Sequence, residues 1–185
     1  FNIQLELALF YNKPLVVHCR KANHKLFEYS GKLKKLPSVL FHSFMGTLIE
    51  ANSLISRNIN FFFSFGKQMM NNNKKVIDCV KNLPEQNLLL ETDAPFQTLR
   101  DERYTKLEDI KLIYESARNI RQADENFYSV MELNFKRMFL DHVIDVTYEI
   151  EYHHMRRYAG NYTTYLKLKE EIALKQEKDY EAQQA

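Results

Sequence analysis

The chain has 185 residues, of which 45% are hydrophobic and 27% are charged, and its formal net charge is +2 at pH 7. This composition is typical of a globular domain with a core, and it argues against an intrinsically disordered chain and against a membrane span. So small a net charge neither favours nor excludes a nucleic-acid partner, because only clustering of the basic residues would indicate one.

The two cysteines, Cys19 and Cys79, are too few for a disulfide framework. We therefore expect a reducing, cytoplasmic compartment, and no stretch resembles a targeting segment. The chain begins at Phe1, and its first ten residues, FNIQLELALF, already have helical apolar spacing. We expect that further sequence precedes this helix.

Up to residue 139, predicted helices alternate with short apolar strands. The predicted strands are 14–18, 38–42, 60–66 and 88–90, and the predicted helices are 1–10, 21–35, 48–57, 74–83, 106–122 and 125–139. The strands are uniformly apolar, which is typical of a parallel sheet covered on both faces. Their spacing fits the repeats of a (β/α)8 barrel, and a doubly wound α/β sheet fits nearly as well.

Three of these strands end in a residue that can bind a metal. PLVVHCR delivers His18, SVLFHSF delivers His42, and LLLETDAP delivers Asp93 just before Pro95. Side chains at the carboxyl ends of parallel strands share one edge of the sheet, where α/β enzymes place their chemistry. Two imidazoles and a carboxylate suit a divalent metal ion, although each histidine taken alone is more often an ordinary buried residue.

Two neighbours of these residues have both functional and ordinary interpretations. Glu91 could orient a metal-binding histidine, or it could be a carboxylate in water or at a helix N-terminus. Arg20 could bind a phosphate group, because a guanidinium matches phosphate geometry, or it could be solvated or salt-bridged.

The character of the sequence changes beyond Phe139. DHVIDVTYEI alternates like one strand of an antiparallel ribbon, a turn is predicted at 151–156, and a second strand is possible at Arg157 and Tyr158. The remainder after Gly160 and Asn161 contains strong helix formers and predicts a long, highly charged helix. We therefore predict two domains, 1–139 and 140–185.

Several motifs of residues 1–139 together resemble those of one known family. PLVVHCRKA, HSFMG, FSFG, LLLETDAP and NFKRMF resemble, in order and spacing, the TatD family of metal-dependent deoxyribonucleases. The resemblance implies a (β/α)8 barrel that hydrolyses DNA with divalent metals such as Mg²⁺, Mn²⁺ or Zn²⁺, in a two-metal site. It also implies that His18, His42 and Asp93 are metal ligands, with Asp93 orienting or deprotonating the attacking water.

The chain departs from the family pattern in two places. It begins after the family's HxH pair and its metal-bridging glutamate, and FQTLRDERYTKLEDI lacks the family's usual asparagine-proline segment. We therefore expect the C-terminal half of a barrel, with about four parallel strands and little or no nuclease activity by itself.

The tail resembles a different family. Phe139-Leu140-Asp141, the strand after it, and Gly160-Asn161-Tyr162 resemble the segment that follows the first nucleotide-binding site of ABC-F translation factors. No P-loop is present, so ATP hydrolysis by that mechanism is not expected. The resemblance implies a ribosome or RNA contact through the terminal helix, and a join of two unrelated fragments is the simplest hypothesis.

The main function predicted from the sequence is therefore a fragment of a metal-dependent deoxyribonuclease. Two alternatives remain. One is another amidohydrolase-like hydrolase that uses the same strand-end ligands, and the other is a ribosome-associated binding module that acts through the tail.

Overall fold

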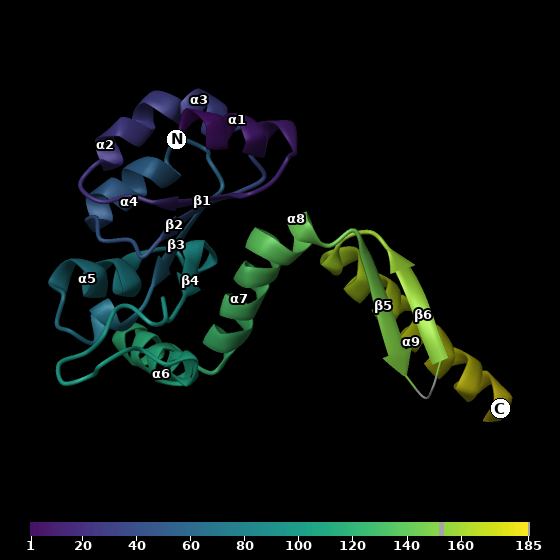
Figure 1. Ribbon diagram of the computed structural model, residues 1–185. Coiled ribbons are helices and arrows are strands. Elements are labelled where there is room, and N and C mark those ends of the chain that lie inside the picture. The colour runs from purple at the N-terminus through teal and green to yellow at the C-terminus, as the bar shows by residue number, and fades with distance from the viewer. Residues whose placement is uncertain (152–153, 185) are drawn as a thin grey trace. The chain divides into compact units, whose positions relative to one another are not determined.

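A computed structural model of the chain describes residues 1–151 and 154–184. Contacts between residues divide the chain into two compact units, Phe1–Met138 and Phe139–Ala185. Figure 1 shows the helices and strands of both units, coloured by residue number. In the part of the chain that the structure describes, no helix combines the length and the apolar character needed to cross a lipid bilayer.

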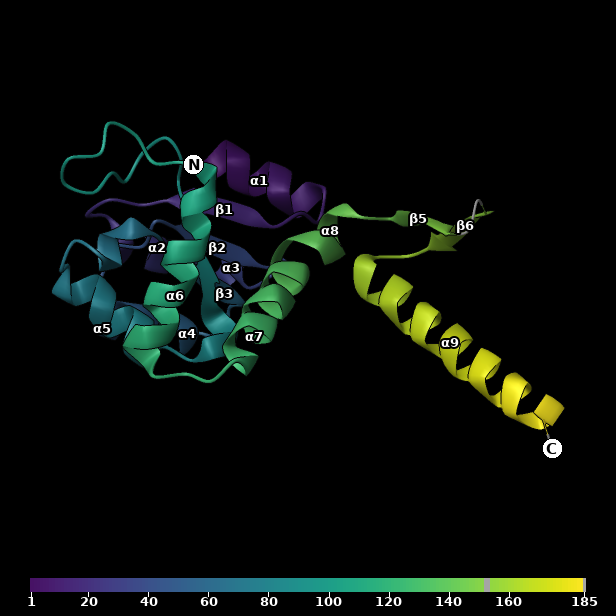
Figure 2. The same ribbon diagram turned by 90° about the horizontal axis from the view of Figure 1, so that it is seen from below.

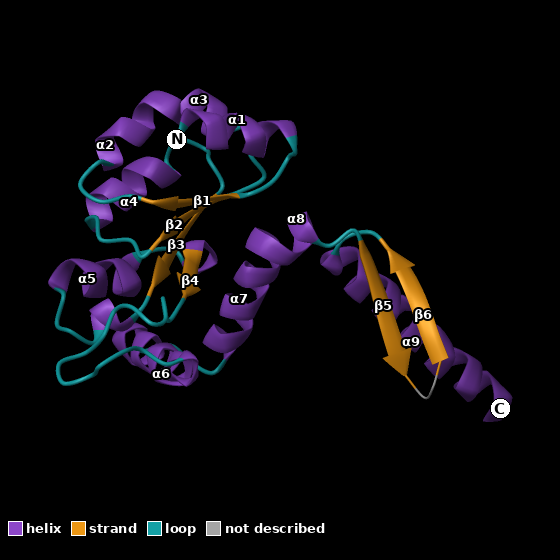
Figure 3. Cartoon of the chain, in the orientation of Figure 1, coloured by secondary structure: helices purple, strands orange, loops and turns teal. Residues whose placement is uncertain are grey.

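Unit 1 is built on a four-stranded parallel sheet (Figure 3). The strands are β1 (Leu15–His18), β2 (Val39–His42), β3 (Phe61–Phe65) and β4 (Leu88–Leu90), and they lie side by side in chain order. In register, Leu15 pairs with Val39 and His18 pairs with His42. The predicted α/β class with a parallel sheet is thus confirmed, and the strand ends share one edge.

The helices and short helical segments of unit 1 connect and cover these strands. They are α1 (Asn2–Phe10), α2 (Asn23–Leu26), η1 (Phe27–Tyr29), α3 (Ser30–Leu33), α4 (Leu48–Ile55), η2 (Lys67–Met69), α5 (Lys74–Asn82), η3 (Glu85–Asn87), η4 (Leu107–Asp109), α6 (Ile110–Arg121) and α7 (Asn126–Phe135). The π-helical segment η5 (Lys136–Leu140) follows and crosses the boundary between the units. α5 and α6 lie side by side (Figures 1 and 2), and Arg121 of α6 donates to the carbonyls of Val80 and Leu83 at 2.6 and 2.9 Å.

The core consists of phenylalanines from β2 and β3 packed against the helices. All five residues of β3 are buried, and the ring of Phe63 stacks on that of Phe41 with centroids 5.4 Å apart. On the other face of the sheet, Phe62 and Leu89 pack against Met138. Both faces of the central strand are therefore apolar and covered, which explains why its sequence shows no alternation.

One predicted helix differs from the structure. The stretch 21–35 was expected to form a single crossover helix, but it forms α2, η1 and α3 in succession. The hydroxyl of Ser30 donates to the carbonyl of Phe27 at 2.7 Å, and Tyr29 leaves the helical region at φ −96° and ψ 3°. Such a local hydrogen bond competes with the helical ladder, and Gly31 next to it favours a helix less than any residue except proline.

Unit 2 contains α8 (Asp141–Val143), the antiparallel pair β5 (Val146–Glu151) and β6 (His154–Ala159), and α9 (Tyr162–Gln184). Two details of the prediction were wrong. The first strand begins at Val146 because the residues from Asp141 form a helical turn, where the Asp141 carboxylate accepts from the amide of Thr163 at 2.8 Å. Residues 154–156, expected in a turn, belong to β6, while residues 152–153 of that turn lie outside the described residues.

The two strands of unit 2 are tied to α9 through Glu149. Its carboxylate accepts from the hydroxyls of Tyr158 and Tyr165, each at 3.0 Å, and it also pairs with Lys169. Two strands alone bury little apolar surface, so the helix completes this small unit.

Candidate metal centre at the carboxyl edge of the sheet

The imidazole of His42 lies between two carboxylates. Nδ1 of His42 is 2.8 Å from Oε2 of Glu91, and Nε2 is 3.2 Å from Oδ1 of Asp93. The three side chains are 26%, 17% and 22% exposed, so they are shielded but open to a small ligand. Their donor atoms all lie within 4.8 Å of one another.

The backbone places these three side chains. His42 is the last residue of β2, and the amide of Glu91 donates to the carbonyl of Phe65 at 3.0 Å, which extends the pairing of β4 by one residue. Asp93 then adopts φ +52°, and the amide of Phe96 donates to its carbonyl at 2.7 Å. The chain thus reverses immediately after the strand, and the Asp93 carboxylate returns toward His42.

Two residues that the sequence argument missed support the carboxylates. The hydroxyl of Ser64 donates to Oε2 of Glu91 in a short hydrogen bond. The amide of Gln97 donates to Oδ2 of Asp93 at 3.1 Å and to the hydroxyl of Ser43 at 3.0 Å. Ser64 could have been singled out from the sequence, because it interrupts the apolar run FFFSF. Nothing in the sequence distinguishes Gln97 from the other polar residues of its loop.

His18 and Arg20 occupy different positions. His18 is the register partner of His42, and the two ring centroids are 5.6 Å apart, but His18 is exposed and lies outside the tight set of three residues. Arg20 lines a neighbouring pocket with Lys21, Lys74 and Lys75. The structure therefore brings His42, Glu91 and Asp93 together, with His18 beside them.

The space between Nε2 of His42 and Oδ1 of Asp93 suits a cation. If Nδ1–H donates to Glu91, the lone pair of Nε2 faces the Asp93 carboxylate, so two acceptors approach each other. A metal ion or a proton between them would remove this conflict. Two ligand atoms on one tetrahedral Zn²⁺ are about 3.3 Å apart, given bonds of about 2.0 Å, and the observed separation of 3.2 Å agrees with this.

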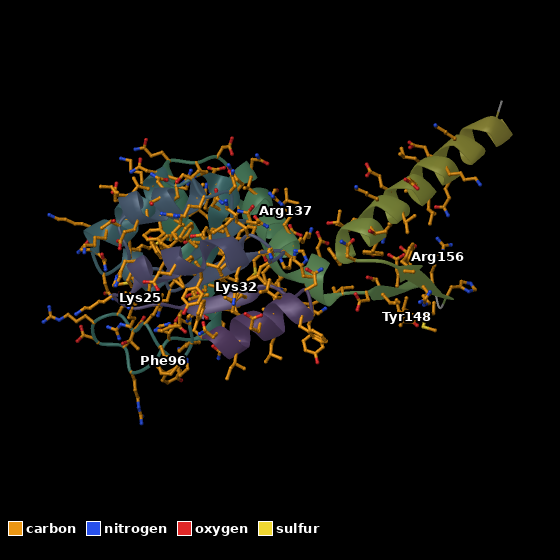
Figure 4. The ribbon with its side chains drawn as sticks, turned by 90° about the horizontal axis from the view of Figure 1, so that it is seen from above. Lys25, Lys32, Phe96, Arg137, Tyr148 and Arg156 are labelled. Atoms are coloured by element: carbon orange, nitrogen blue, oxygen red, sulfur yellow. The ribbon has the colours of Figure 1, made fainter. Side chains whose placement is uncertain are left out.

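The loop after β4 is fixed by a buried lysine. The side chain of Lys67 is fully buried, and its Nζ lies 2.6 Å from Oε2 of Glu102 and 2.7 Å from Oδ2 of Asp109. Burial acts to lower the pKa of Lys67, but the hydrogen bonds to Asp109 and Glu102 outweigh it and raise that pKa. Figure 4 shows Phe96, which is 67% exposed, on the same loop.

A parallel α/β sheet with histidine and carboxylates at its carboxyl edge is the arrangement of metal-dependent hydrolases. Comparison with known proteins gives the family. Residues 1–140 match the model of the TatD related DNase family, and the chain belongs to that family.

Among its relatives, a metal-dependent hydrolase of Bacillus subtilis is 30% identical over 144 residues, which are 75% of this chain and 56% of that protein. A 3'-5' ssDNA/RNA exonuclease TatD of Edwardsiella piscicida is 29% identical over 147 residues, with the same coverage of each. The crystal structure of a TatD homologue from Escherichia coli K12 matches with a TM-score of 0.68 at 23% identity, over 75% of this chain and 54% of that one.

The chain thus spans about half the length of these relatives. Residues 148–185 match a second family model, described as ABC transporter. That match covers only part of unit 2.

Proposed function

We propose that the chain carries one part of the metal centre of a deoxyribonuclease that hydrolyses phosphodiester bonds in DNA. The observation that carries the proposal is the convergence of His42 and Asp93 with Glu91 at the strand ends. In this assignment His18, His42 and Asp93 are metal ligands, Glu91 orients His42, and Arg20 binds a phosphate. Membership of the TatD related DNase family supports this function over that of another amidohydrolase-like hydrolase.

The residues of the chain have distinct tasks in this reaction. The chemistry that a divalent ion supplies when bound is Lewis acidity toward the phosphate and a lower pKa of the attacking water. The Asp93 carboxylate would accept a proton from that water. The side-chain amide of Gln97 holds Oδ2 of Asp93 in place through a hydrogen bond of 3.1 Å. Glu91 fixes the tautomer of His42 through Nδ1, so Nε2 keeps its lone pair for the metal.

We also propose that unit 1 is the C-terminal half of a (β/α)8 barrel and that it has little turnover in this chain. Four consecutive parallel strands and the TM-score of 0.68 to a TatD homologue support the partial barrel. A two-metal site needs more ligands than His18, His42 and Asp93 supply. A single bound ion with weak hydrolysis is therefore expected.

The test combines metal binding with turnover. Titration of the whole chain with Mn²⁺ should show one site that is lost in Asp93→Asn and in His42→Ala, but kept in Asp101→Asn, a change of an exposed aspartate elsewhere on the loop. Incubation with single-stranded DNA and Mg²⁺ or Mn²⁺ should give little product. An unchanged Mn²⁺ site in Asp93→Asn would refute the assignment, and rapid turnover abolished by Asp93→Asn would refute the expected inactivity.

For residues 140–185 we propose a second function, a binding module that contacts a ribosome or RNA. The proposal rests on the resemblance of this segment to ABC-F translation factors, and the match of residues 148–185 to the ABC transporter model agrees with the ABC part of that resemblance. Co-sedimentation of the chain with ribosomes, lost on truncation after residue 139, is the expected result. Equal co-sedimentation of the truncated chain would contradict it.

A further inference from the structure

A second pocket opens beside the candidate metal centre, at the same carboxyl edge of the sheet. Its volume is about 530 Å³, which is within the range of small-ligand sites. The residues that follow β1 and β2 form part of its wall, and the first turn of α5 forms another part. Cys19 directly follows His18, so the pocket adjoins the strand end that carries a proposed metal ligand.

The charges around this pocket are mostly positive. Arg20, Lys21, Lys74 and Lys75 line it, against the single carboxylate of Glu50. Among the residues that the structure describes, no carboxylate lies within 4 Å of any of the four cations. None of the four cations is therefore held in a close ion pair, although the Lys75 charge lowers the pKa of Glu50 across the pocket.

Glu50 is already engaged at the start of α4. Its carboxylate accepts from the amide of Thr47 at 2.7 Å, from the Thr47 hydroxyl at 3.0 Å and from Asn23 at 3.2 Å. Chiefly the Thr47 amide lowers the pKa of Glu50, so this carboxylate stays ionised.

The N-terminus of α5 adds to the positive potential. Lys74 and Lys75 are the first two residues of this nine-residue helix, and Asn73 caps it by accepting from the amides of Lys75 and Val76. Cations at this end are disfavoured by the helix dipole. Two adjacent lysines here have no structural advantage, which points to an anionic ligand.

We propose that this pocket binds a phosphate of the nucleic-acid chain other than the scissile one, with Lys21, Lys74 and Lys75 as the contacting cations. The inference rests on the proposed function and specifies its substrate as an oligonucleotide that extends past the cleavage position. A strand whose reacting phosphate lies at His42 and Asp93 then continues along the sheet edge into the pocket. Because lysine contacts phosphate as a point charge, this subsite reads no base sequence.

The test uses a charge-matched pair of double variants of the full chain. Lys74→Gln with Lys75→Gln removes two cations from the pocket, and it should not weaken folding because it relieves the dipole of α5. Lys34→Gln with Lys35→Gln removes two adjacent lysines that are also exposed and that directly follow α3, ahead of the amino end of β2 at the opposite edge of the sheet. Both variants have the same net charge, so only position distinguishes them.

Binding is measured by fluorescence anisotropy with labelled single-stranded (dT)10 in EDTA, so that no strand is cleaved. The pocket variant should bind about tenfold more weakly. The plot of log association constant against log salt concentration has a negative slope, which should become shallower by about 1.4, the value for two phosphate contacts on a single strand. The control variant should change affinity less than twofold. A (dT)10 analogue with an uncharged methylphosphonate backbone should bind neither variant nor the wild type.

Equal weakening in the two variants, or none in the pocket variant, would overturn the inference. Retained binding of the uncharged analogue would overturn it as well, because the bases would then carry the affinity. The proposed function fails differently: Mn²⁺ binding would then be the same in wild type, His42→Ala and Asp93→Asn, while (dT)10 binding would still depend on Lys74 and Lys75.

Discussion

Nε2 of His42 lies 3.2 Å from Oδ1 of Asp93, although the two residues are 51 positions apart, at the end of β2 and in the loop after β4, and these two strands are not neighbours in the sheet. β3 separates β2 from β4, and its Ser64 donates a short hydrogen bond to Oε2 of Glu91, which in turn contacts Nδ1 of His42. The closeness of the two side chains is thus a consequence of the strand order and of the turn that follows β4, in which Asp93 has φ +52°. It creates a site that no single strand provides.

Glu91→Gln should weaken metal binding without unfolding the chain. The substitution keeps the shape of the side chain but reduces its ability to accept from Nδ1 of His42, so the ring loses its fixed orientation. Loss of such a supporting partner typically lowers metal affinity about 10- to 100-fold. Calorimetric titration with Zn²⁺ or Mn²⁺ measures the metal affinity. The control is Glu115→Gln, at an exposed glutamate on α6. Equal affinities in wild type and Glu91→Gln would show that Glu91 does not support the ligand.

Lys67→Met should destabilise unit 1 at neutral pH and should change its pH dependence. The hydrogen bonds from Lys67 chiefly lower the pKa of Glu102 and of Asp109 below their ordinary values of 4.5 and 3.8. These carboxylates therefore stabilise the fold above their unfolded pKa values, and that contribution is lost as the pH falls through their folded ones. The pKa of Lys67 is raised above its ordinary value of 10.5. Its contribution to the free energy of unfolding is therefore fully present below pH 10.5 and is lost only at higher pH.

The free energy of unfolding, from urea titrations between pH 2 and pH 7, tests this expectation. Wild type should lose stability more steeply toward low pH than Lys67→Met, so the difference between them should narrow below pH 4. The exposed change Lys111→Met should run parallel to wild type. Two parallel curves for wild type and Lys67→Met would contradict the role of this lysine.

The sequence predicted the parallel sheet because its strands are short apolar runs with a polar residue at each end. It also predicted that His18, His42 and Asp93 share one edge, since strand ends meet there in any parallel arrangement, and it left Glu91 open between a supporting role and an ordinary carboxylate. It did not reveal Gln97, whose contact depends on a loop with φ +57° at that residue. Nor did it predict that His18 stands beside the set, because register alone does not determine which way an exposed ring points.

Phe63→Ala should cost about 3 to 5 kcal/mol in the free energy of unfolding of unit 1, the usual cost for a buried aromatic residue. Phe63 is fully buried, and its ring centroid lies 5.4 Å from that of Phe41 and 4.8 Å from that of Phe44. The control is Phe10→Ala at a residue that is 80% exposed, which should cost less than about 0.5 kcal/mol. Urea unfolding followed by circular dichroism measures both. A similar cost for the two changes would mean that the aromatic core does not form as described.

Thr47→Ala should destabilise α4 and, through it, the wall of the basic pocket. The Thr47 hydroxyl accepts from the amide of Glu50 at 3.2 Å while the Glu50 carboxylate accepts from the Thr47 amide, a reciprocal capping box. Loss of the cap should cost about 1 kcal/mol. It should also free the Glu50 carboxylate to approach Lys75, whose charge already lowers the pKa of Glu50, although less than the hydrogen bonds from Thr47 and Asn23 do. Affinity for (dT)10 should then fall, because a mobile carboxylate competes with phosphate for the lysine.

Ser53→Ala in the middle of α4 is the control for this change. Alanine favours the helix more than serine does, so stability should stay equal or rise slightly, and (dT)10 binding should not change. Hydrogen exchange of the first-turn amides of α4 locates the effect: they should exchange faster in Thr47→Ala and not in Ser53→Ala. If Thr47→Ala accelerates exchange in α4 yet leaves (dT)10 affinity intact, the capping box is only structural, and the restraint of Glu50 has no part in phosphate binding.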